Sequence, residues 1–206
     1  MRRRVGVLIS GRGSNMLSLI QAARANDFPA EIVLVLSNRD EAGGLARARE
    51  AGIAAHAVPS RPFGRDRAAH EAALTTALEA AGVEIVCLAG YMRLFSPVFV
   101  QRWAGRMLNI HPSLLPAFPG VDTHARALAA GVKLHGCTVH LVTEGMDEGP
   151  ILAQAAVPVR AGDTEEVLAA RVLAQEHLLY PAALRHFLAG GGREADGGAA
   201  LRNPEN

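Results

Sequence analysis

Met107-Leu-Asn-Ile-His-Pro-Ser-Leu-Leu-Pro-Ala-Phe-Pro119 is an apolar run that reaches an amide and an imidazole before its first proline. If the run is a strand, the side chains of Asn109 and His111 lie on the same face, because they are two positions apart. Pro112 ends the strand, since proline cannot donate to a sheet ladder. Open α/β sheets bind ligands at such carboxyl ends. The pair could therefore stabilise an oxyanion on a carbonyl substrate; the competing interpretation is a histidine with purely structural hydrogen bonds.

Strands and helices alternate outward from this stretch, which implies parallel strands joined by right-handed crossovers. The β-branched and apolar runs predict strands at 5–9, 32–36, 54–58, 85–89 and 107–110. Helical periodicity and end signals predict helices over about 16–23, 42–51, 66–81 and 96–103. Two extended runs, 136–142 and 151–157, flank a turn-rich segment and predict an antiparallel extension. The expected fold is α/β and Rossmann-like, with a twisted, mainly parallel sheet and helices on both faces.

The C-terminal part of the chain predicts one long helix followed by a tail. Asp163 and Glu166 have the spacing of a capping box, with Asp163 at the N-cap, and the helix should run to about Tyr180. Pro181 should begin a further turn or helix to Leu188. We expect a single domain over 1–188, with a nucleotide-binding half at about 1–105 and a catalytic half at about 106–188. The glycine-rich residues 189–206 should form a disordered tail.

Composition limits the possible functions. The 206 residues are half hydrophobic, which suffices for one core, and 21 Lys and Arg nearly balance 20 Asp and Glu. No nucleic-acid partner is therefore indicated. There is no apolar run of about 18 residues and no signal-peptide pattern, which favours a cytoplasmic protein without a membrane partner. Cys87 and Cys137 are expected to be buried free thiols. We expect no metal site, because His135 and His140 should point to opposite strand faces and no Cys-x-x-Cys occurs.

The loop after the first strand, Ser10-Gly-Arg-Gly-Ser-Asn15, predicts a phosphate site of a particular kind. Met16 stands where a dinucleotide fingerprint has its third glycine, and no Gly-Lys-Ser/Thr occurs. A nicotinamide site and a P-loop are therefore disfavoured. The remaining interpretation is one phosphate at a helix N-terminus, approached at Gly13 and bound by Ser14 and Asn15. The alternative is a tight turn that Ser14 merely caps.

A turn between the two antiparallel runs, residues 143–150, carries three carboxylates, at Glu144, Asp147 and Glu148. Acids in surface loops are usually only solvated. One of them could nevertheless reach His111, where a neighbouring negative charge stabilises an imidazolium. The sequence does not choose among the three.

Six motifs, in order along the chain, carry a resemblance to a known family. They are Ile9-Ser-Gly-Arg-Gly-Ser-Asn15, Leu88-Ala-Gly-Tyr-Met-Arg-Leu94, Leu108-Asn-Ile-His-Pro-Ser-Leu-Leu-Pro116, Gly136-Cys-Thr-Val-His140, Met146-Asp-Glu-Gly-Pro150 and Gln175-Glu-His177. Together they resemble the phosphoribosylglycinamide formyltransferase family, over nearly the whole chain to about His186. The resemblance implies transfer of the formyl group of 10-formyltetrahydrofolate, a co-substrate, to the amine of 5-phosphoribosylglycinamide in purine biosynthesis. It also implies small-molecule partners, no metal, and a monomer or homodimer.

The same resemblance assigns roles by position. Asn109, His111 and Asp147 match the catalytic group; Gly13, Ser14, Asn15 and Glu176 match the ribonucleotide site. The residues that match the folate site are Arg67, Met92, Arg93, Leu94, Phe95, Asn109, Thr143, Glu144, Gly145, Met146 and Asp147. Arg67 is placed across a one-residue insertion near Phe63.

Three other functions share parts of this pattern. A folate-linked hydrolase would use water as the formyl acceptor and would not need the phosphate loop. A methionyl-tRNA formyltransferase would need a basic C-terminal domain, whereas only a short Gly-rich tail follows His186. A non-catalytic folate- or nucleotide-binding module would not need Asn109, His111 and Asp147 together.

Overall fold

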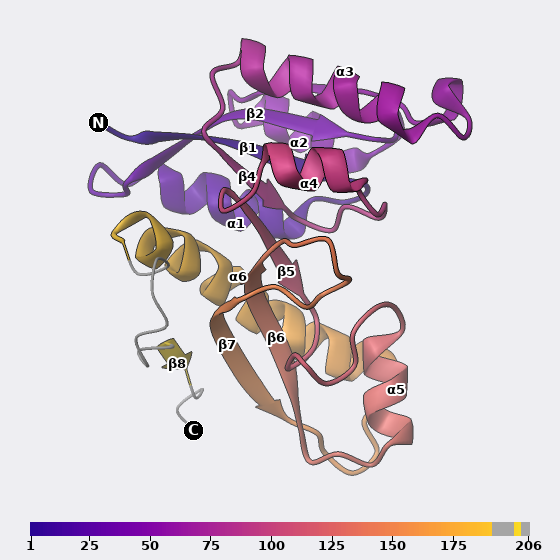
Figure 1. Ribbon diagram of the computed structural model, residues 1–206. Coiled ribbons are helices and arrows are strands. Elements are labelled where there is room, and N and C mark those ends of the chain that lie inside the picture. The colour runs from indigo at the N-terminus through magenta and orange to yellow at the C-terminus, as the bar shows by residue number, and fades with distance from the viewer. Residues whose placement is uncertain (191–199, 203–206) are drawn as a thin grey trace. The chain divides into compact units, whose positions relative to one another are not determined.

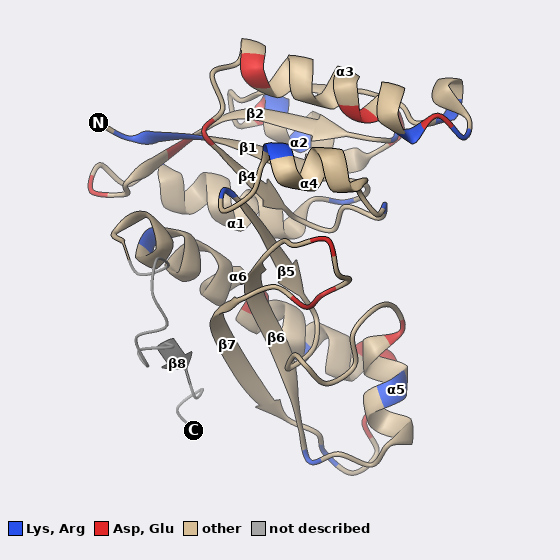
Figure 2. Cartoon of the chain, viewed as in Figure 1, with Lys and Arg blue, Asp and Glu red and all other residues tan. Residues whose placement is uncertain are grey.

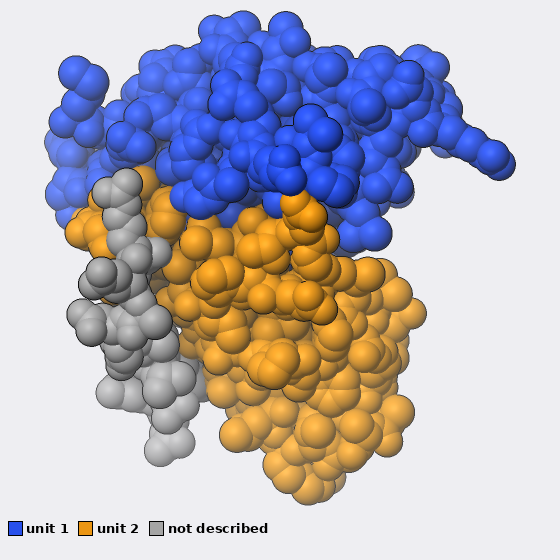
Figure 3. Space-filling view, viewed as in Figure 1, with its two compact units in different colours: residues 1–109 blue, residues 110–206 orange. Residues whose placement is uncertain are grey.

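The computed structural model describes residues 1–190 and 200–202. The chain forms two compact units, Met1–Asn109 and Ile110–Asn206 (Figure 3). Strand β5 (Met107–His111) contains the boundary, so Asn109 ends unit 1 and His111 lies in unit 2.

Unit 1 is a parallel sheet with the strand order β3-β2-β1-β4-β5 (Figure 1). The strands are β1 (Arg3–Ile9), β2 (Ala30–Ser37), β3 (Ala54–Ala57), β4 (Ile85–Leu88) and β5. The helices are α1 (Ser14–Ala23), α2 (Gly43–Glu50), α3 (Arg67–Ala80) and α4 (Pro97–Arg102), with a 3-10 turn η1 (Arg61–Phe63). Helix α1 contacts α2 and α3 contacts α4. Right-handed crossovers place these pairs on opposite faces of the sheet.

Burial on both faces explains why the strands of unit 1 are continuously apolar. All four residues of β4 are buried, and β1 is buried from Val5 to Ile9. Figure 2 shows the central strands almost without charged residues. A parallel sheet covered by helices on both faces requires such strands. Polar side chains are therefore expected in the loops that follow the carboxyl ends of these strands, and not within the strands.

Unit 2 contains an antiparallel pair, β6 (Leu134–Leu141) and β7 (Ile151–Pro158), with helices α5 (Thr123–Ala129) and α6 (Glu165–Leu188). A short strand, β8 (Ala200–Arg202), pairs with β7 in parallel. Helix α6 packs on both β6 and β7 and buries Leu168, Val172 and Leu179, which share one helical face. The predicted fold class, including the antiparallel extension, is confirmed.

Two sequence-based predictions about local structure were wrong, and one helix was not predicted. Helix α6 is continuous and contains Pro181, because Leu179, Tyr180, Ala183 and Leu184 are buried around the proline and hold it in the helix. Its N-cap is Thr164, whose hydroxyl accepts from the Val167 N–H, and not Asp163. Helix α5 was not predicted; it begins after Asp122, which has a left-handed backbone and makes no capping bond.

The expected tail, 189–206, falls largely outside the described residues. The predicted domain limits and the division near residue 105 remain predictions. Among the described residues, no helix combines the length and hydropathy needed to cross a bilayer.

Candidate functional site

His111, the last residue of β5, lies next to Asp147 in the turn after β6. Its Nδ1 is 3.4 Å from Asp147 Oδ2, and the two side chains are only 7% and 13% exposed. Asp147 is one of three acids in this turn, and its carboxylate meets the imidazole directly. The contact involves the acid that the family resemblance indicates, whereas residue types alone left three acids open.

The loop after Pro112 fixes the second side of the imidazole. His111 Nε2 is 3.1 Å from the carbonyl oxygen of Phe118, a residue with a left-handed backbone, φ 54°. Both ring nitrogens therefore face oxygen acceptors. These two contacts fix the orientation of the ring.

Hydrogen bonds to the antiparallel pair hold this loop in place. The Thr138 hydroxyl, on β6, donates to the Ser113 carbonyl at 2.7 Å and accepts from the Leu115 N–H at 3.0 Å. The Gln154 amide, on β7, donates to the Leu115 carbonyl at 2.8 Å. The loop that meets His111 is therefore anchored to both strands.

Asp147 makes three polar contacts that fix its carboxylate. Oδ2 accepts from the Gly120 N–H at 2.8 Å, and Oδ1 is 3.7 Å from His140 Nε2. The backbone of Asp147 is left-handed, φ 57°, a conformation that Asp adopts more readily than most residues. Burial lowers the pKa of His140, although its bond to the Leu141 carbonyl and the Asp147 charge act in the opposite direction. A neutral His140 leaves the Asp147 charge available to His111.

Asn109 precedes His111 by two positions on β5 and is half-buried. The pleat of a strand places residues with this spacing on one face. The prediction that the Asn109 amide and the His111 imidazole share one face rests on this spacing along β5.

The predicted phosphate loop opens helix α1 in unit 1. Gly13 is the N-cap, with φ 71° and ψ 34°, and no side chain caps the helix. Ser14 is therefore the first helical residue and does not cap, which disfavours the purely structural interpretation of the loop. A Cβ at Gly13 would lie 3.1 Å from Gly44 Cα, so the loop also packs closely on the start of α2. The backbone N–H groups at this N-terminus can bind an anion.

The segment Met92–Phe95, between β4 and α4, is held by polar and aromatic contacts. The Met92 N–H donates to the Ser10 hydroxyl at 2.8 Å, and the ring of Phe95 stacks between those of Tyr91 and Phe99. Met92 and Leu94 are 68% and 59% exposed. These apolar side chains could cover a flat ring.

The remaining predicted residues lie in separate places. Arg67 begins α3 and is exposed, whereas Glu176 lies on α6 and is buried. The predicted site residues thus divide between the units, with Gly13–Asn15, Arg67, Met92–Phe95 and Asn109 in unit 1 and the others in unit 2.

Sequence reasoning missed two contributors to the His111 site. His140 was considered as a metal ligand and as part of a family motif but not as a neighbour of Asp147, and the Phe118 carbonyl left no signal in the sequence. The position of His140 near the end of a predicted strand, just before the acidic turn, could have indicated it as a neighbour of Asp147. A histidine at such a strand end can reach the carboxylates of the turn that follows. Among the described residues, no cluster of three His, Cys, Asp or Glu side chains could hold a metal ion.

A second pair of histidines in unit 2, His124 and His135, supports the structure of the loop that carries Phe118. His135 Nε2 is 3.2 Å from His124 Nδ1, and His135 also packs its ring edge against Phe118. Burial lowers the pKa of His135 to about 4. The ring is therefore neutral near pH 7 and supports the loop that carries Phe118.

Comparisons with known proteins agree with this geometry. The formyl transferase family model matches residues 3–184. The phosphoribosylglycinamide formyltransferase of Escherichia coli is 47% identical over 184 residues, which cover 89% of this chain and 86% of that protein. A crystal structure of phosphoribosylglycinamide formyltransferase from Brucella melitensis has a TM-score of 0.88 and 62% identity, covering 92% of this chain and 97% of that one.

Longer relatives match only in part. The trifunctional purine biosynthetic protein adenosine-3 of Bos taurus is 46% identical over 197 residues. Those residues cover 96% of this chain but only 19% of the bovine protein.

Proposed function

The chain belongs to the formyl transferase family, and its relatives include phosphoribosylglycinamide formyltransferases. We therefore propose that it transfers a formyl group from 10-formyltetrahydrofolate to the amine of 5-phosphoribosylglycinamide. The observation that carries the proposal is the contact between Asp147 and His111, and Asn109 precedes His111 by two positions on β5. This is a pair of hydrogen-bond donors with a counter-charge, as an acyl-transfer oxyanion requires.

The reaction balances without any further reactant. The glycinamide amine attacks the formyl carbon, a C–N bond forms, and the carbonyl electrons move to oxygen. Collapse of the tetrahedral intermediate breaks the bond between this carbon and N10 of the folate. The proton lost by the amine goes to N10, so the products are the formylated ribonucleotide and tetrahydrofolate. General acid–base transfer of this kind can pass through one water molecule.

Asn109 and His111 stabilise the oxyanion. The Asn109 amide donates one hydrogen bond and the His111 imidazolium donates a second. Donors of this type contribute about 2.7–4 kcal/mol each at the transition state. Since His111 Nε2 faces the Phe118 carbonyl in this structure, the oxyanion takes the place of that carbonyl as acceptor. Asp147 holds the opposite nitrogen and keeps the ring charged and oriented.

The remaining residues of the family pattern bind the two substrates. The ribonucleotide phosphate binds at the α1 N-terminus, through Gly13, Ser14 and Asn15, and Glu176 receives its ribose and glycinamide end. The folate ring lies against Met92–Phe95 and Thr143–Asp147, with Arg67 on its tail. Both substrates are small molecules, and we expect a cytoplasmic monomer or homodimer that uses neither metal nor nucleic acid nor membrane.

A comparison of two reaction mixtures distinguishes formyl transfer to the ribonucleotide from hydrolysis of the formyl folate. The protein is mixed with 10-formyltetrahydrofolate with and without 5-phosphoribosylglycinamide, and folate absorbance is followed. Formation of tetrahydrofolate only when the ribonucleotide is present supports the proposal. An equal rate without the ribonucleotide would identify a hydrolase instead, and no reaction in either mixture would indicate a binding module.

A further inference from the structure

Gln154 lies in the middle of β7, directly opposite Thr138 of β6. Residues opposed in an antiparallel pair share one face of the sheet, so the two side chains can meet. The side-chain nitrogen of Gln154 donates to the Leu115 carbonyl at 2.8 Å and to the Thr138 hydroxyl at 3.0 Å. A side-chain amide has two N–H donors. Both are therefore used, one on the loop after Pro112 and one on the neighbouring strand.

The bond from Gln154 completes the hydrogen bonding of the Thr138 hydroxyl, which is fully buried. This hydroxyl accepts from the Leu115 N–H at 3.0 Å and donates to the Ser113 carbonyl at 2.7 Å. A hydroxyl has two acceptor positions and one proton. Because N–H donors take both acceptor positions, the proton is directed to Ser113. Gln154 thus holds the loop at two points, Leu115 directly and Ser113 through Thr138.

Short-range hydrogen bonds connect this held part of the loop to the residue that meets His111. The Ser113 hydroxyl donates to the Ala117 carbonyl at 2.6 Å. The Ala117 N–H donates to the Leu114 carbonyl at 2.9 Å. Phe118 is the next residue, so its position follows from that of Ala117.

The far part of the loop supplies one partner to each member of the His111–Asp147 pair. The Phe118 carbonyl faces His111 Nε2, and the Gly120 N–H donates to Asp147 Oδ2. A displacement of the loop would therefore move both partners together. The carboxylate and the imidazole would lose the contacts that fix their distance and orientation.

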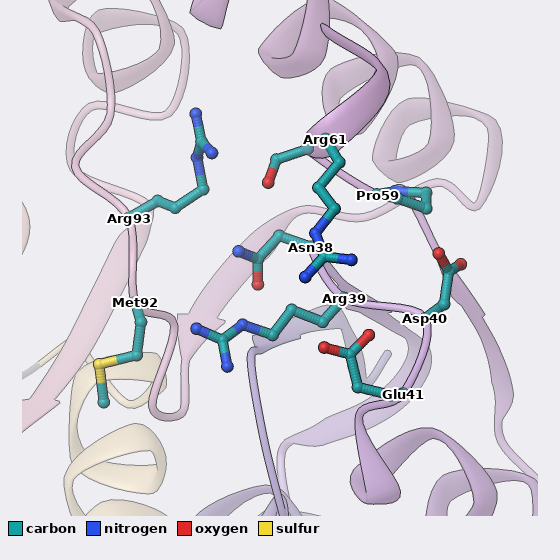
Figure 4. Close-up of a pocket in the computed structure, with 9 residues that line it drawn as sticks. Asn38, Arg39, Asp40, Glu41, Pro59, Arg61, Met92 and Arg93 are labelled. Carbon is teal, nitrogen blue, oxygen red and sulfur yellow. The ribbon is translucent and has the colours of Figure 1, made fainter. Parts of the chain in front are cut away.

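Gln154 belongs to none of the substrate sites assigned above. It is also absent from the lining of the pocket in unit 1 where Arg39, Arg61 and Met92 lie (Figure 4). Its two partners, Leu115 and Thr138, are likewise outside those sites. An effect of Gln154 on the reaction therefore has to pass through the loop that it holds.

We propose that Gln154 is a positioning residue for formyl transfer. By holding Ser113 and Leu115, it keeps the loop where Phe118 and Gly120 fix the His111–Asp147 pair. The proposal rests on the proposed function and extends it to a residue of β7 that contacts neither substrate.

The test removes the two donors without shortening the side chain. Gln154→Met keeps an unbranched side chain of similar length but has no N–H group. The matched control is Arg171→Met, also in unit 2. Arg171 donates to the Pro158 carbonyl at 2.6 Å and forms a salt bridge with Asp163 at 2.7 Å, both away from the loop. Urea unfolding of both variants shows how much stability each loses.

Steady-state kinetics should separate positioning from a general loss of stability. In Gln154→Met, kcat should fall about tenfold, as expected when one hydrogen bond of ordinary strength is lost from the transition-state geometry. The KM of each substrate should stay within about twofold. Arg171→Met should keep the wild-type kcat at a temperature where both variants are folded.

Combination with Asp147→Asn tests whether Gln154 acts through the His111–Asp147 contact. Residues that act on one contact are not additive. The Gln154 substitution should therefore cost less than about threefold in kcat when Asp147 is already Asn. The same tenfold loss in both backgrounds would overturn the proposal, and so would an unchanged kcat in Gln154→Met or an equal loss in Arg171→Met.

Hydrogen exchange of the Gly120 amide gives a measurement that does not need turnover. Its exchange should become about tenfold faster in Gln154→Met, because the loop that carries it is held less firmly. It should be unchanged in Arg171→Met. Unchanged exchange at Gly120 in Gln154→Met would contradict the coupling through the loop.

Two further points keep the outcomes distinct. If the wild-type chain does not transfer the formyl group to the ribonucleotide, the proposed function fails, and the positioning role fails with it. If transfer occurs, the variants alone decide about Gln154. If Gln154→Met does not fold, Gln154→Asn replaces it, because an amide shorter by one methylene cannot reach both partners; the same selective loss of kcat is expected, and wild-type kcat would overturn the proposal.

Discussion

At the scale of single residues, Asp147 is the group whose position depends most on tertiary structure. Three acids share its turn, and Asp147 combines a contact with His111, a bond from the Gly120 N–H and an approach to His140. Sequence reasoning could propose that an acid from this turn supports the histidine. Residue types alone could not choose the acid, and only the family resemblance indicated Asp147; its left-handed backbone, φ 57°, is a feature of the folded turn.

Replacing Asp147 by Asn should narrow the pH range of activity. The change keeps an oxygen for the Gly120 N–H and a residue that tolerates φ 57°, but it removes the negative charge beside two imidazoles. The imidazolium of the active form then loses its counter-charge, so the alkaline limb of the kcat profile should move to lower pH. Turnover at the acid side should change least.

The matched control for this variant is Glu148→Gln, in the same turn. Its pH–rate profile should follow that of the wild type. If the Asp147 variant keeps the wild-type profile while the Glu148 variant shifts, the supporting acid has been assigned wrongly.

At the scale of elements, the sequence was sufficient for the strands and for most helices, because burial on both faces leaves continuous apolar runs in strands and burial on one face leaves helical periodicity. It failed at α6, where helix propensity would stop at Pro181. Burial of residues on both sides of the proline outweighs its missing hydrogen bond, which costs about 3 kcal/mol. It also failed at the α6 N-cap, because Asp163 and Thr164 are both good caps. The salt bridge from Asp163 to Arg171, 2.7 Å, decides between them and is a tertiary feature.

The N-terminus of α1 gives a prediction about substrate selectivity. Gly13→Val introduces a β-branched residue at φ 71° and a Cβ 3.1 Å from Gly44 Cα. It should displace the backbone N–H groups that receive the phosphate. Calorimetry should therefore show a large loss of affinity for 5-phosphoribosylglycinamide and a small one for the folate.

Gly43→Ala is the control for this substitution. Gly43 lies at the start of α2, and an added Cβ there meets nothing within 4 Å. Both affinities should be unchanged in that variant. Equal losses for both substrates in the Gly13 variant would mean that the loop has only a structural role.

At the scale of the whole molecule, stability should depend on pH through His135. Its folded-state pKa is about 4, lowered chiefly by burial, whereas the free imidazole has a pKa of 6.5. The unfolded chain therefore binds the proton first. The stability that the neutral ring supports is present above about pH 6.5 and is lost as the pH falls towards 4. The loss should reach about 3 kcal/mol.

Urea unfolding at several pH values measures this dependence. The unfolding free energy of the wild type should exceed that of the His135→Gln variant at pH 7, and this difference should shrink as the pH is lowered to 4. The same comparison for His56→Gln, at an exposed position on β3, should show little change. A pH-independent difference for His135 would mean that its ring is solvated in the folded chain.

The most direct test of the oxyanion site is the single-turnover rate of formyl transfer in Asn109→Ala, His111→Ala and the double variant, with substrate binding measured by calorimetry. Each single change should slow the chemical step by roughly 10²–10³ while both substrates still bind. The double variant should lose less than the product of the two single losses, because both donors serve one developing charge. Unchanged rates in either single variant, or fully multiplicative losses in the double one, would contradict the shared oxyanion site.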